Sequence, residues 1–205
     1  MRISTVLTIA LAWNAAFVSA AGTAVQPTIV LRVVNEGRVD PEMLRAAQKE
    51  AARILRSSGI ELVWMVCEPE HVVQGDRCGR VMAANEFWMR VVTRRPSNTN
   101  TDVLGFTELG GEGRADSAAV FAPAAAALAG NWGLTSGQIL GAAMVHEIGH
   151  LYLGVHAHVA ASIMSGHWTR QELMGISIGE LTFSRPQARM LQERIAGNRG
   201  MPPQK

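Results

Sequence analysis

The residues with the clearest chemical potential in this sequence are His146, Glu147 and His150, which form the pentapeptide HEIGH. Side chains at positions i and i+4 of a helix lie one above the other on the same face, so both imidazoles can reach one metal ion. Glu147 is offset around the helix, where its carboxylate can act on a water molecule instead of binding the metal. Zn²⁺ lowers the pKa of a bound water, and a neighbouring carboxylate can then take up the proton. The pattern therefore predicts a catalytic zinc site with Glu147 as general base.

A helix with two surface histidines is the alternative interpretation of this pentapeptide. The residues on both sides of it are apolar, AAMV before and LYL after, which predicts a buried helix whose polar groups need partners. A catalytic zinc takes three protein ligands, and we expect the third after the helix ends at Gly154. His156 and His158 both follow that position closely. We therefore expect a metal site whose third ligand is one of these two histidines.

The stretch HEIGHLYLGVH resembles the extended zinc-binding motif of the metzincin metallopeptidases, in which a third histidine follows the second at the spacing of His156. The sequence departs from that motif because Leu153 stands where metzincins have the helix-ending glycine, and Gly154 follows one place later. The longer segment HEIGHLYLG-x3-H-x4-IM-x3-W is similar to a group of uncharacterised exported bacterial proteins described as metalloproteases. In those the ligand candidate lies at the position of His158. We favour His158 and keep His156 as the alternative.

A further part of the metzincin resemblance is the tripeptide SIM at 162–164. It resembles the metzincin Met-turn, whose methionine lies beneath the metal site as a hydrophobic base, and this implies the same role for Met164. An ordinary core methionine is the alternative. The tyrosine that follows this turn in some metzincins is absent, and we expect His167 at the surface or beside the ligands rather than among them.

The elements around this helix predict an α/β fold with a mixed twisted sheet of about five strands. Runs of β-branched and other apolar residues indicate strands at 28–35, 60–66, 87–93, 103–108 and 118–122. Helical spacing and capping residues indicate helices from Pro41 to near Gly59, over 136–153, from Thr169, and from Ser184 to about Ala196. The alanine-rich run 124–129 fits either a helical turn or a connector. The metzincin resemblance implies an α+β zincin-like fold with an active-site helix, a C-terminal helix and an antiparallel cleft strand at 103–108.

The first 20 residues have the composition of a secretory signal peptide, with Arg2, an apolar run over 6–18, and small residues before the expected cleavage site after Ala20. The apolar run is shorter than the roughly 20 residues that cross a bilayer. We therefore expect a secreted or periplasmic protein with no stable membrane insertion once the leader is removed.

Cys67 and Cys78 are the only cysteines in the chain. An even number in an oxidising compartment predicts a disulfide, which here closes a polar loop and removes about 3 kcal/mol of unfolded-state entropy. A metal site on these two cysteines is the alternative, but they lack the C-x-x-C spacing.

The composition indicates one globular domain and disfavours one class of partner. The chain has 205 residues, of which 48% are hydrophobic and 18% charged, and its formal net charge is +2. Such a chain can bury one core and is not intrinsically disordered, and its weak net field disfavours a nucleic-acid partner. We expect one domain over 21–197, a flexible tail over 198–205, and a monomer.

These features favour an exported zinc-dependent peptidase that hydrolyses peptide bonds in a peptide or protein substrate. A second hypothesis is a non-catalytic exported module that binds zinc or peptides. In that case His156 and His158 would both bind the metal and close the site. A third hypothesis is a zinc amidase that acts on cell-wall peptides.

Overall fold

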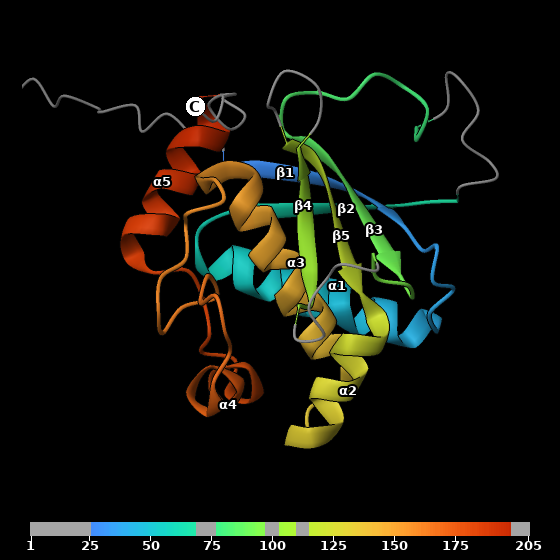
Figure 1. Cartoon of the computed structure of the whole chain (residues 1–205). Coiled ribbons are helices and arrows are strands. Elements are labelled where there is room, and N and C mark those ends of the chain that lie inside the picture. The colour runs from blue at the N-terminus through green and yellow to red at the C-terminus, as the bar shows by residue number, and fades with distance from the viewer. Residues whose placement is uncertain (1–25, 69–76, 97–102, 110–114, 198–205) are drawn as a thin grey trace, which may run out of the picture.

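The structure is a computed structural model, and it describes residues 26–68, 77–96, 103–109 and 115–197. Figure 1 shows how the helices and strands of these residues are arranged. In chain order they are β1 (Thr28–Val34), α1 (Pro41–Ser57), β2 (Glu61–Cys67), β3 (Glu86–Val92), β4 (Gly105–Leu109), β5 (Ala115–Phe121), α2 (Ala122–Trp132), α3 (Ser136–Leu153), α4 (Arg170–Ile178) and α5 (Arg185–Ala196).

The strands form one mixed sheet in the order β2-β1-β3-β5-β4. β1, β2, β3 and β5 pair in parallel, whereas β4 pairs antiparallel with β5. The mixed sheet of about five strands expected from the sequence is confirmed. The segment expected at 103–108 forms the antiparallel strand β4, and β2 and β4 are the two edges of the sheet.

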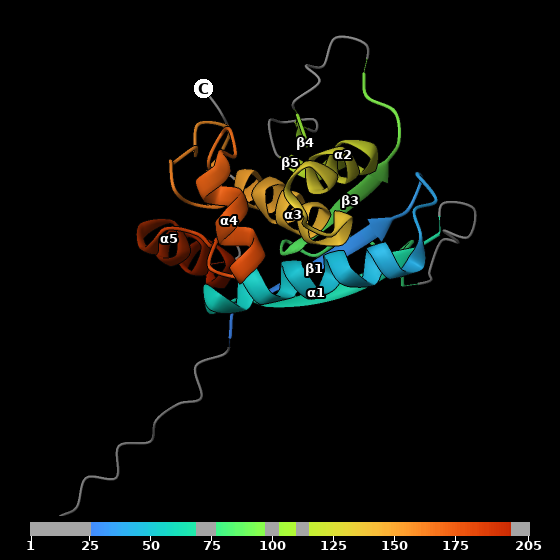
Figure 2. The same cartoon turned by 90° about the horizontal axis from the view of Figure 1, so that it is seen from below.

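Helices α1 and α3 cover one face of this sheet, and the hydrophobic core lies between them and the strands (Figures 1 and 2). Alternate residues of β1 (Ile29, Leu31 and Val33) are completely buried in this core, as expected for side chains that share one face of a strand. α3 is buried along almost its whole length. The fold therefore places the predicted metal-binding helix in the interior, beside the antiparallel edge of the sheet.

The region of β5 and α2 resolves one open alternative and corrects one expected boundary. The alanine-rich run 124–129, for which the sequence allows a helical turn or a connector, belongs to the helix α2, which begins directly at the end of β5. The strand expected over 118–122 starts earlier, at Ala115, and Ala122 is already the first residue of the helix. Alanine is the strongest helix former, but a run of small residues has no apolar stripe from which to recognise the helix. The left-handed residue Gly133 then ends α2.

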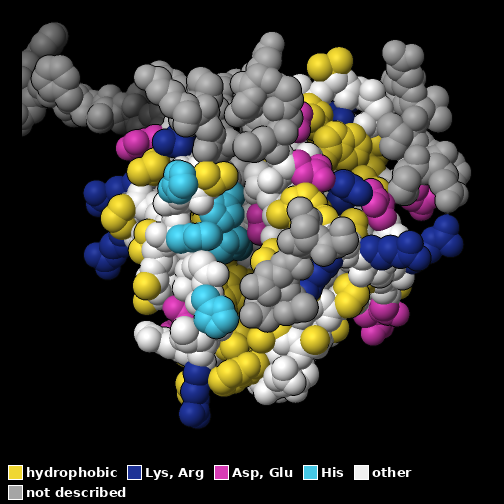
Figure 3. All heavy atoms as spheres, viewed as in Figure 1, with side chains coloured by type: hydrophobic (Ala, Val, Ile, Leu, Met, Phe, Trp, Pro, Cys, Tyr) yellow, Lys and Arg dark blue, Asp and Glu magenta, His cyan; other side chains and the backbone are white. Residues whose placement is uncertain are grey.

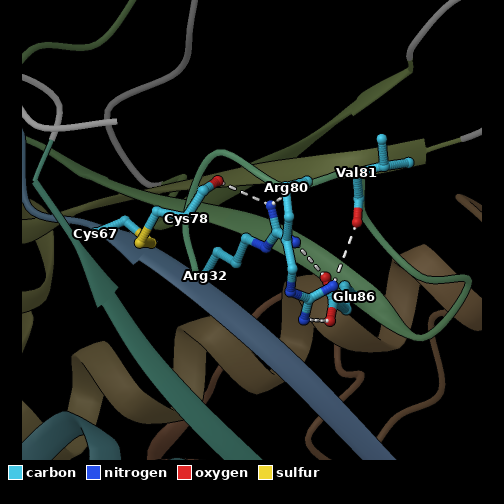
Figure 4. A network of polar contacts seen from close by, with 6 residues as sticks. All are labelled: Arg32, Cys67, Cys78, Arg80, Val81 and Glu86. Atoms are coloured by element: carbon cyan, nitrogen blue, oxygen red, sulfur yellow. Dashed lines mark hydrogen bonds and ion pairs between the residues drawn. A yellow bond between two sulfur atoms is a disulfide. The ribbon is translucent and has the colours of Figure 1, made fainter. Parts of the chain in front are cut away.

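The opposite face of the sheet carries a buried ion pair next to the disulfide (Figure 4). Cys67, at the end of β2, is bonded to Cys78, which confirms the predicted disulfide. Arg32 of β1 is 1% exposed and donates from Nη1 to the carbonyl oxygens of Cys78 and Arg80, both at 2.9 Å. From Nη2 it donates to the carboxylate of Glu86, which also accepts from Arg80. The cross-linked segment thus holds two carbonyl acceptors against a buried guanidinium.

Within the described residues, no helix is both long and apolar enough to span a bilayer. The predicted signal peptide (1–20) and the expected tail (198–205) lie outside the described residues. Cleavage after Ala20 therefore stays a prediction.

Candidate metal centre

Helix α3 fixes the positions of His146 and His150. It begins at a capping box, in which Thr135 and Gln138 satisfy each other's backbone groups. It ends at Gly154, whose φ of 92° suits glycine and strains other residue types. The two histidines lie one helical turn apart on one face, with ring centroids separated by 4.7 Å. The predicted i, i+4 pair is therefore present as a pair of adjacent rings.

Hydrogen bonds to the backbone orient both rings. Nδ1 of His146 donates to the carbonyl oxygen of Ile163 at 2.8 Å, and Nδ1 of His150 donates to that of Gly154 at 2.9 Å. A carbonyl oxygen only accepts, so each Nδ1 carries the proton of its neutral ring and each Nε2 keeps a free lone pair. Metal-binding histidines are commonly held in this way. Both rings are thus prepared to offer Nε2 to a metal.

His158 brings a third ring to the same point. Its Nε2 lies 3.1 Å from Nε2 of His150, which in turn lies 3.0 Å from Nε2 of His146. Among the described residues these three histidines are the one group that could hold a metal ion. His156 is exposed and is not a member of this group. Figure 3 shows histidine side chains gathered on one face of the molecule.

The arrangement fits a metal ion that prefers imidazole ligands. Two nitrogens bound to a tetrahedral zinc at about 2.0–2.1 Å lie about 3.3–3.4 Å apart, close to the separations of 3.0 and 3.1 Å seen here. Burial lowers the pKa of His146 to about 4 and also lowers the pKa of His150. Both rings are therefore neutral near pH 7, and the neutral imidazole is the form that binds a metal.

Met164 lies in the turn that follows His158 in the chain and packs against α3. It is completely buried, and its N–H donates to Oγ of Ser162 at 3.1 Å. A Cβ built on Gly149, which lies next to His150 in α3, would collide with the sulfur of Met164. The absence of a side chain at Gly149 therefore leaves the space that Met164 occupies. The turn that contains Met164 is in direct contact with α3, which carries His146 and His150.

Glu147 faces the same cavity as the histidines but is not part of the ligand group. Its Oε2 accepts a hydrogen bond of 2.9 Å from the hydroxyl of Thr107 in β4. The side chain is 5% exposed, and burial raises the pKa of Glu147 to about 7, although the Thr107 hydrogen bond acts in the opposite direction. A carboxyl group that exchanges its proton near neutral pH is suited to general acid–base catalysis.

These groups line one cavity of about 650 Å³. His146, Glu147 and His150 face it from α3, and His158 faces it from the segment that follows this helix. Residues 103–107 border the cavity from the β4 side, and the turn 165–168 closes another side. Helix α2 lines it with the face formed by Ala124, Ala127, Leu128 and Asn131. Since β4 is an edge strand, its outer backbone groups can pair with an extended peptide beside the histidines.

The structure adds groups that the sequence does not identify, namely Thr107 and the pocket face of α2. Thr107 lies 40 residues before Glu147 in the chain, so their contact does not follow from local spacing. The one signal for it in the sequence is that Thr107 lies within the expected cleft strand at 103–108. Trp168 lies edge-on to His146, with ring centroids 6.2 Å apart. His167, expected at the surface or beside the ligands, is an exposed residue that lines the cavity.

A comparison with protein-family models gives no match for this chain, and a comparison with curated proteins gives none either. What can be said of its function therefore comes from the geometry of the site.

Proposed function

We propose that this protein is an exported zinc-dependent peptidase of the metzincin-like class. The observation that carries the proposal is the buried carboxyl of Glu147, which faces the same cavity as three convergent imidazoles. Within the described residues no fourth ligand joins His146, His150 and His158. Three protein ligands with one open position are typical of catalytic zinc, whereas structural zinc has four. This supports the peptidase over a closed, non-catalytic site.

Each residue then has a defined task. The three histidines would hold zinc through Nε2, and zinc when bound supplies a Lewis acid that activates water near neutral pH. Glu147 takes up the proton that the attacking water loses and returns it to the departing amine. Thr107 holds the carboxyl group through its hydroxyl. The outer edge of β4 would bind the extended substrate through backbone hydrogen bonds.

An exported location is supported by the bond between Cys67 and Cys78. Disulfides form and persist in oxidising compartments and are rare in the cytosol. The proposed substrates are therefore peptides or proteins outside the cytoplasm.

The decisive experiment compares the chain without its first 20 residues with its Glu147→Gln variant. Metal analysis should find one zinc per chain in both proteins. Mass spectrometry of a digested peptide library should show cleavage only by the unaltered protein, with the variant slower by about 10²–10⁴-fold. Zinc in both proteins and no cleavage by either would favour the binding module instead. Equal cleavage by both would exclude Glu147 as the base.

A matched pair of substitutions tests the third ligand. His158→Ala should lower zinc content well below one per chain, because it removes one of the three convergent nitrogens. His156→Ala removes an exposed imidazole two residues away and should leave zinc content unchanged. The reverse result would make His156 the ligand and would refute the assignment of His158.

A further inference from the structure

The third histidine of the metal centre is held differently from the other two. His146 and His150 lie in α3, and hydrogen bonds from Nδ1 to backbone carbonyls fix their rings. His158 is exposed and lies after α3 in a segment without regular secondary structure. Among the described residues no hydrogen bond holds its Nδ1, yet its ring centroid lies 4.8 Å from that of His150. The position of this ring therefore depends on what fixes the backbone on either side of His158.

The backbone of this segment contains a residue in a strained conformation. Ala161 has a φ of 55°, in the left-handed region. That conformation is unfavourable for alanine and persists only where surrounding contacts hold it. Within the segment, the N–H of Val159 donates to the carbonyl oxygen of Met164 at 3.0 Å, and the hydroxyl of Ser162 donates to that of Val159 at 2.8 Å. These bonds tie the segment to itself, so contacts from outside it must fix where it lies.

One such contact comes from Glu172, at the start of α4. Glu172 is 5% exposed, and its Oε2 accepts hydrogen bonds from the N–H of Thr169, at 2.9 Å, and from its hydroxyl, which completes the capping box of α4. Its Oε1 accepts from the N–H of Ala161 at 3.2 Å. The hydrogen bond from Thr169 lowers the pKa of Glu172, so the acceptor is an ionised carboxylate near neutral pH. The same side chain therefore starts α4 and holds the strained residue that follows His158.

A second contact comes from Gln187, at the start of α5, and is built in the same way. Gln187 is 7% exposed, and its Oε1 accepts from the N–H and the hydroxyl of Ser184 at 3.2 and 3.0 Å, which completes the capping box of α5. Its Nε2 donates to the carbonyl oxygen of Ala157 at 2.9 Å. Ala157 directly precedes His158 in the chain. Two capping residues therefore bind the backbone on both sides of the third histidine.

The capping box at the start of α3 shows that these contacts are additional to helix capping. Gln138 accepts from the N–H and the hydroxyl of Thr135, both at 3.0 Å. Among the described residues its Nε2 has no hydrogen-bond partner. A capping box is thus complete without a further contact. The bonds from Glu172 and Gln187 to the segment 157–161 need another explanation.

We propose that Glu172 and Gln187 are positioning residues, which hold His158 among the metal ligands by binding the backbone on both sides of it. This inference rests on the metal centre of the proposed function, but it does not require that the protein cleaves peptides. α4 and α5 both pack against α3, which carries the other two ligands (Figure 1). The two capping residues therefore join the ligand outside the helix to the packed unit that contains the ligands within it.

The test exchanges the capping side chains for side chains of the same shape. Glu172→Gln keeps one oxygen for the cap and replaces the acceptor of the Ala161 N–H by an NH2 group. Gln187→Glu also keeps an oxygen for the cap and replaces the donor to Ala157 by a second oxygen. Gln138→Glu is the matched control, because it makes the same exchange in a capping box that does not contact this segment. Glutamate and glutamine both serve at this position of a capping box, so all three helices keep their caps.

The first measurement is NMR of the metal-free chain without its first 20 residues. In the unaltered protein and in Gln138→Glu, nuclear Overhauser contacts should join the rings of His150 and His158, whose centroids lie 4.8 Å apart. Glu172→Gln and Gln187→Glu should lose these contacts, because one side of the segment is then released.

The second measurement is zinc affinity, from competition with a chromophoric chelator. The dissociation constant should rise by about 10- to 100-fold in Glu172→Gln and in Gln187→Glu, as is typical when a group that orients a metal ligand is removed, and by less than about two-fold in Gln138→Glu. Circular dichroism should show the same helix content in all four proteins. A general loss of structure would lower the helix content, whereas a misplaced ligand would not.

Retained ring contacts and unchanged zinc affinity in both variants would overturn the proposal. Equal losses in Gln138→Glu would also overturn it, because the effect would then come from helix capping in general. A measurement on the unaltered protein does not depend on any variant folding. The Ala161 amide should be protected from hydrogen exchange by its bond to Glu172, and rapid exchange there would overturn the proposal. The NMR measurements need neither zinc nor cleavage, so the peptidase proposal can fail independently.

Discussion

Two glutamates in this protein are equally hidden from water and have opposite electrostatic surroundings. Glu86 is 4% exposed and Glu147 is 5% exposed. Burial alone would raise the pKa of Glu86, but hydrogen bonds from Arg80 and Arg32 outweigh it and hold that pKa below its usual value. Among the described residues, the carboxyl group of Glu147 is hydrogen-bonded only to the neutral hydroxyl of Thr107, and its pKa is raised to about 7.

The difference shows that the partners of a buried carboxyl group, rather than its burial, decide whether it stays ionised or exchanges its proton near neutral pH. A carboxylate between two guanidinium groups stays ionised and stabilises the fold through them. A carboxyl group held beside a cavity without a cation can gain and lose a proton near pH 7. The two residues therefore predict opposite responses to the same substitution and to the same change of pH.

The largest expected effect is the loss of stability in Glu86→Gln. This change leaves Arg32 as a buried guanidinium without a counter-charge, which typically costs about 3–5 kcal/mol. Glu147→Gln replaces a carboxyl group that has no cationic partner among the described residues by a neutral amide, so in the metal-free protein at pH 7.5 it should increase stability by about 2–3 kcal/mol. Urea unfolding at pH 7.5 with a chelator present measures both. Equal losses in the two variants would contradict the comparison.

Breaking the disulfide should have the next largest effect. The double variant Cys67→Ser/Cys78→Ser should lose about 3 kcal/mol of unfolding free energy, from the entropy regained by the unfolded chain. The loss should also depend on Glu86, because the carbonyl oxygen of Cys78 is an acceptor for Arg32. When the disulfide variant is combined with Glu86→Gln, the total loss of unfolding free energy should therefore be smaller than the sum of the two separate losses by about 0.5 kcal/mol or more.

The matched control for the disulfide variant is the combination with Glu147→Gln. Glu147 lies in α3 on the other side of the sheet and shares no partner with the cross-linked segment. Unfolding free energies should be additive within about 0.5 kcal/mol for this pair. Strong coupling here would mean that the disulfide also supports the candidate metal centre.

The sequence is sufficient to predict some of this site and not the rest, for physical reasons. His146, Glu147 and His150 follow from helical geometry within one turn, so the spacing alone brings the two rings together. The choice between His156 and His158 depends on the path of the chain after Gly154, which is set by tertiary contacts. The metzincin spacing implied His156, whereas the similarity to the exported bacterial proteins favoured His158, and the convergent ring is that of His158.

The fold shows the same division between local and long-range information. Capping boxes at Thr169 and Ser184 predict the starts of α4 and α5, and the structure contains both. The disulfide and the mixed sheet also follow from patterns in the chain. The partners that distinguish Glu86 from Glu147 could not be predicted, because Arg32 lies 54 residues before the one and Thr107 lies 40 before the other.

The pH dependence of stability should separate the two glutamates by sign. In the metal-free protein the pKa of Glu147 is about 7 when folded and 4.5 when unfolded, so the folded state holds the proton more tightly. Relative to Glu147→Gln, stability should therefore fall by about 2–3 kcal/mol as the pH rises from 4.5 to 7. His146, with its pKa lowered to about 4, stays neutral over most of this range.

Glu86 should show the opposite trend, because its folded pKa lies below the unfolded value of 4.5. Relative to Glu86→Gln, its stabilising contribution should be complete above pH 4.5 and should decrease as the pH falls below that value. Urea unfolding from pH 4 to pH 8 in the presence of a chelator measures both differences. The same sign for both residues would refute the contrast between them.

The smallest expected effect concerns Thr107, whose hydroxyl is the hydrogen-bond partner of the Glu147 carboxyl group in the described part of the chain. This hydrogen bond lowers the pKa of Glu147, so Thr107→Val should raise it further. In the metal-free protein the fall in stability should then extend to higher pH by less than about one unit, or roughly 1 kcal/mol. Thr107→Ser keeps the hydroxyl and should leave the profile unchanged. A shift to lower pH in Thr107→Val would mean that the hydroxyl stabilises the protonated carboxyl group. The raised pKa of Glu147 would then be due to this contact instead of to burial.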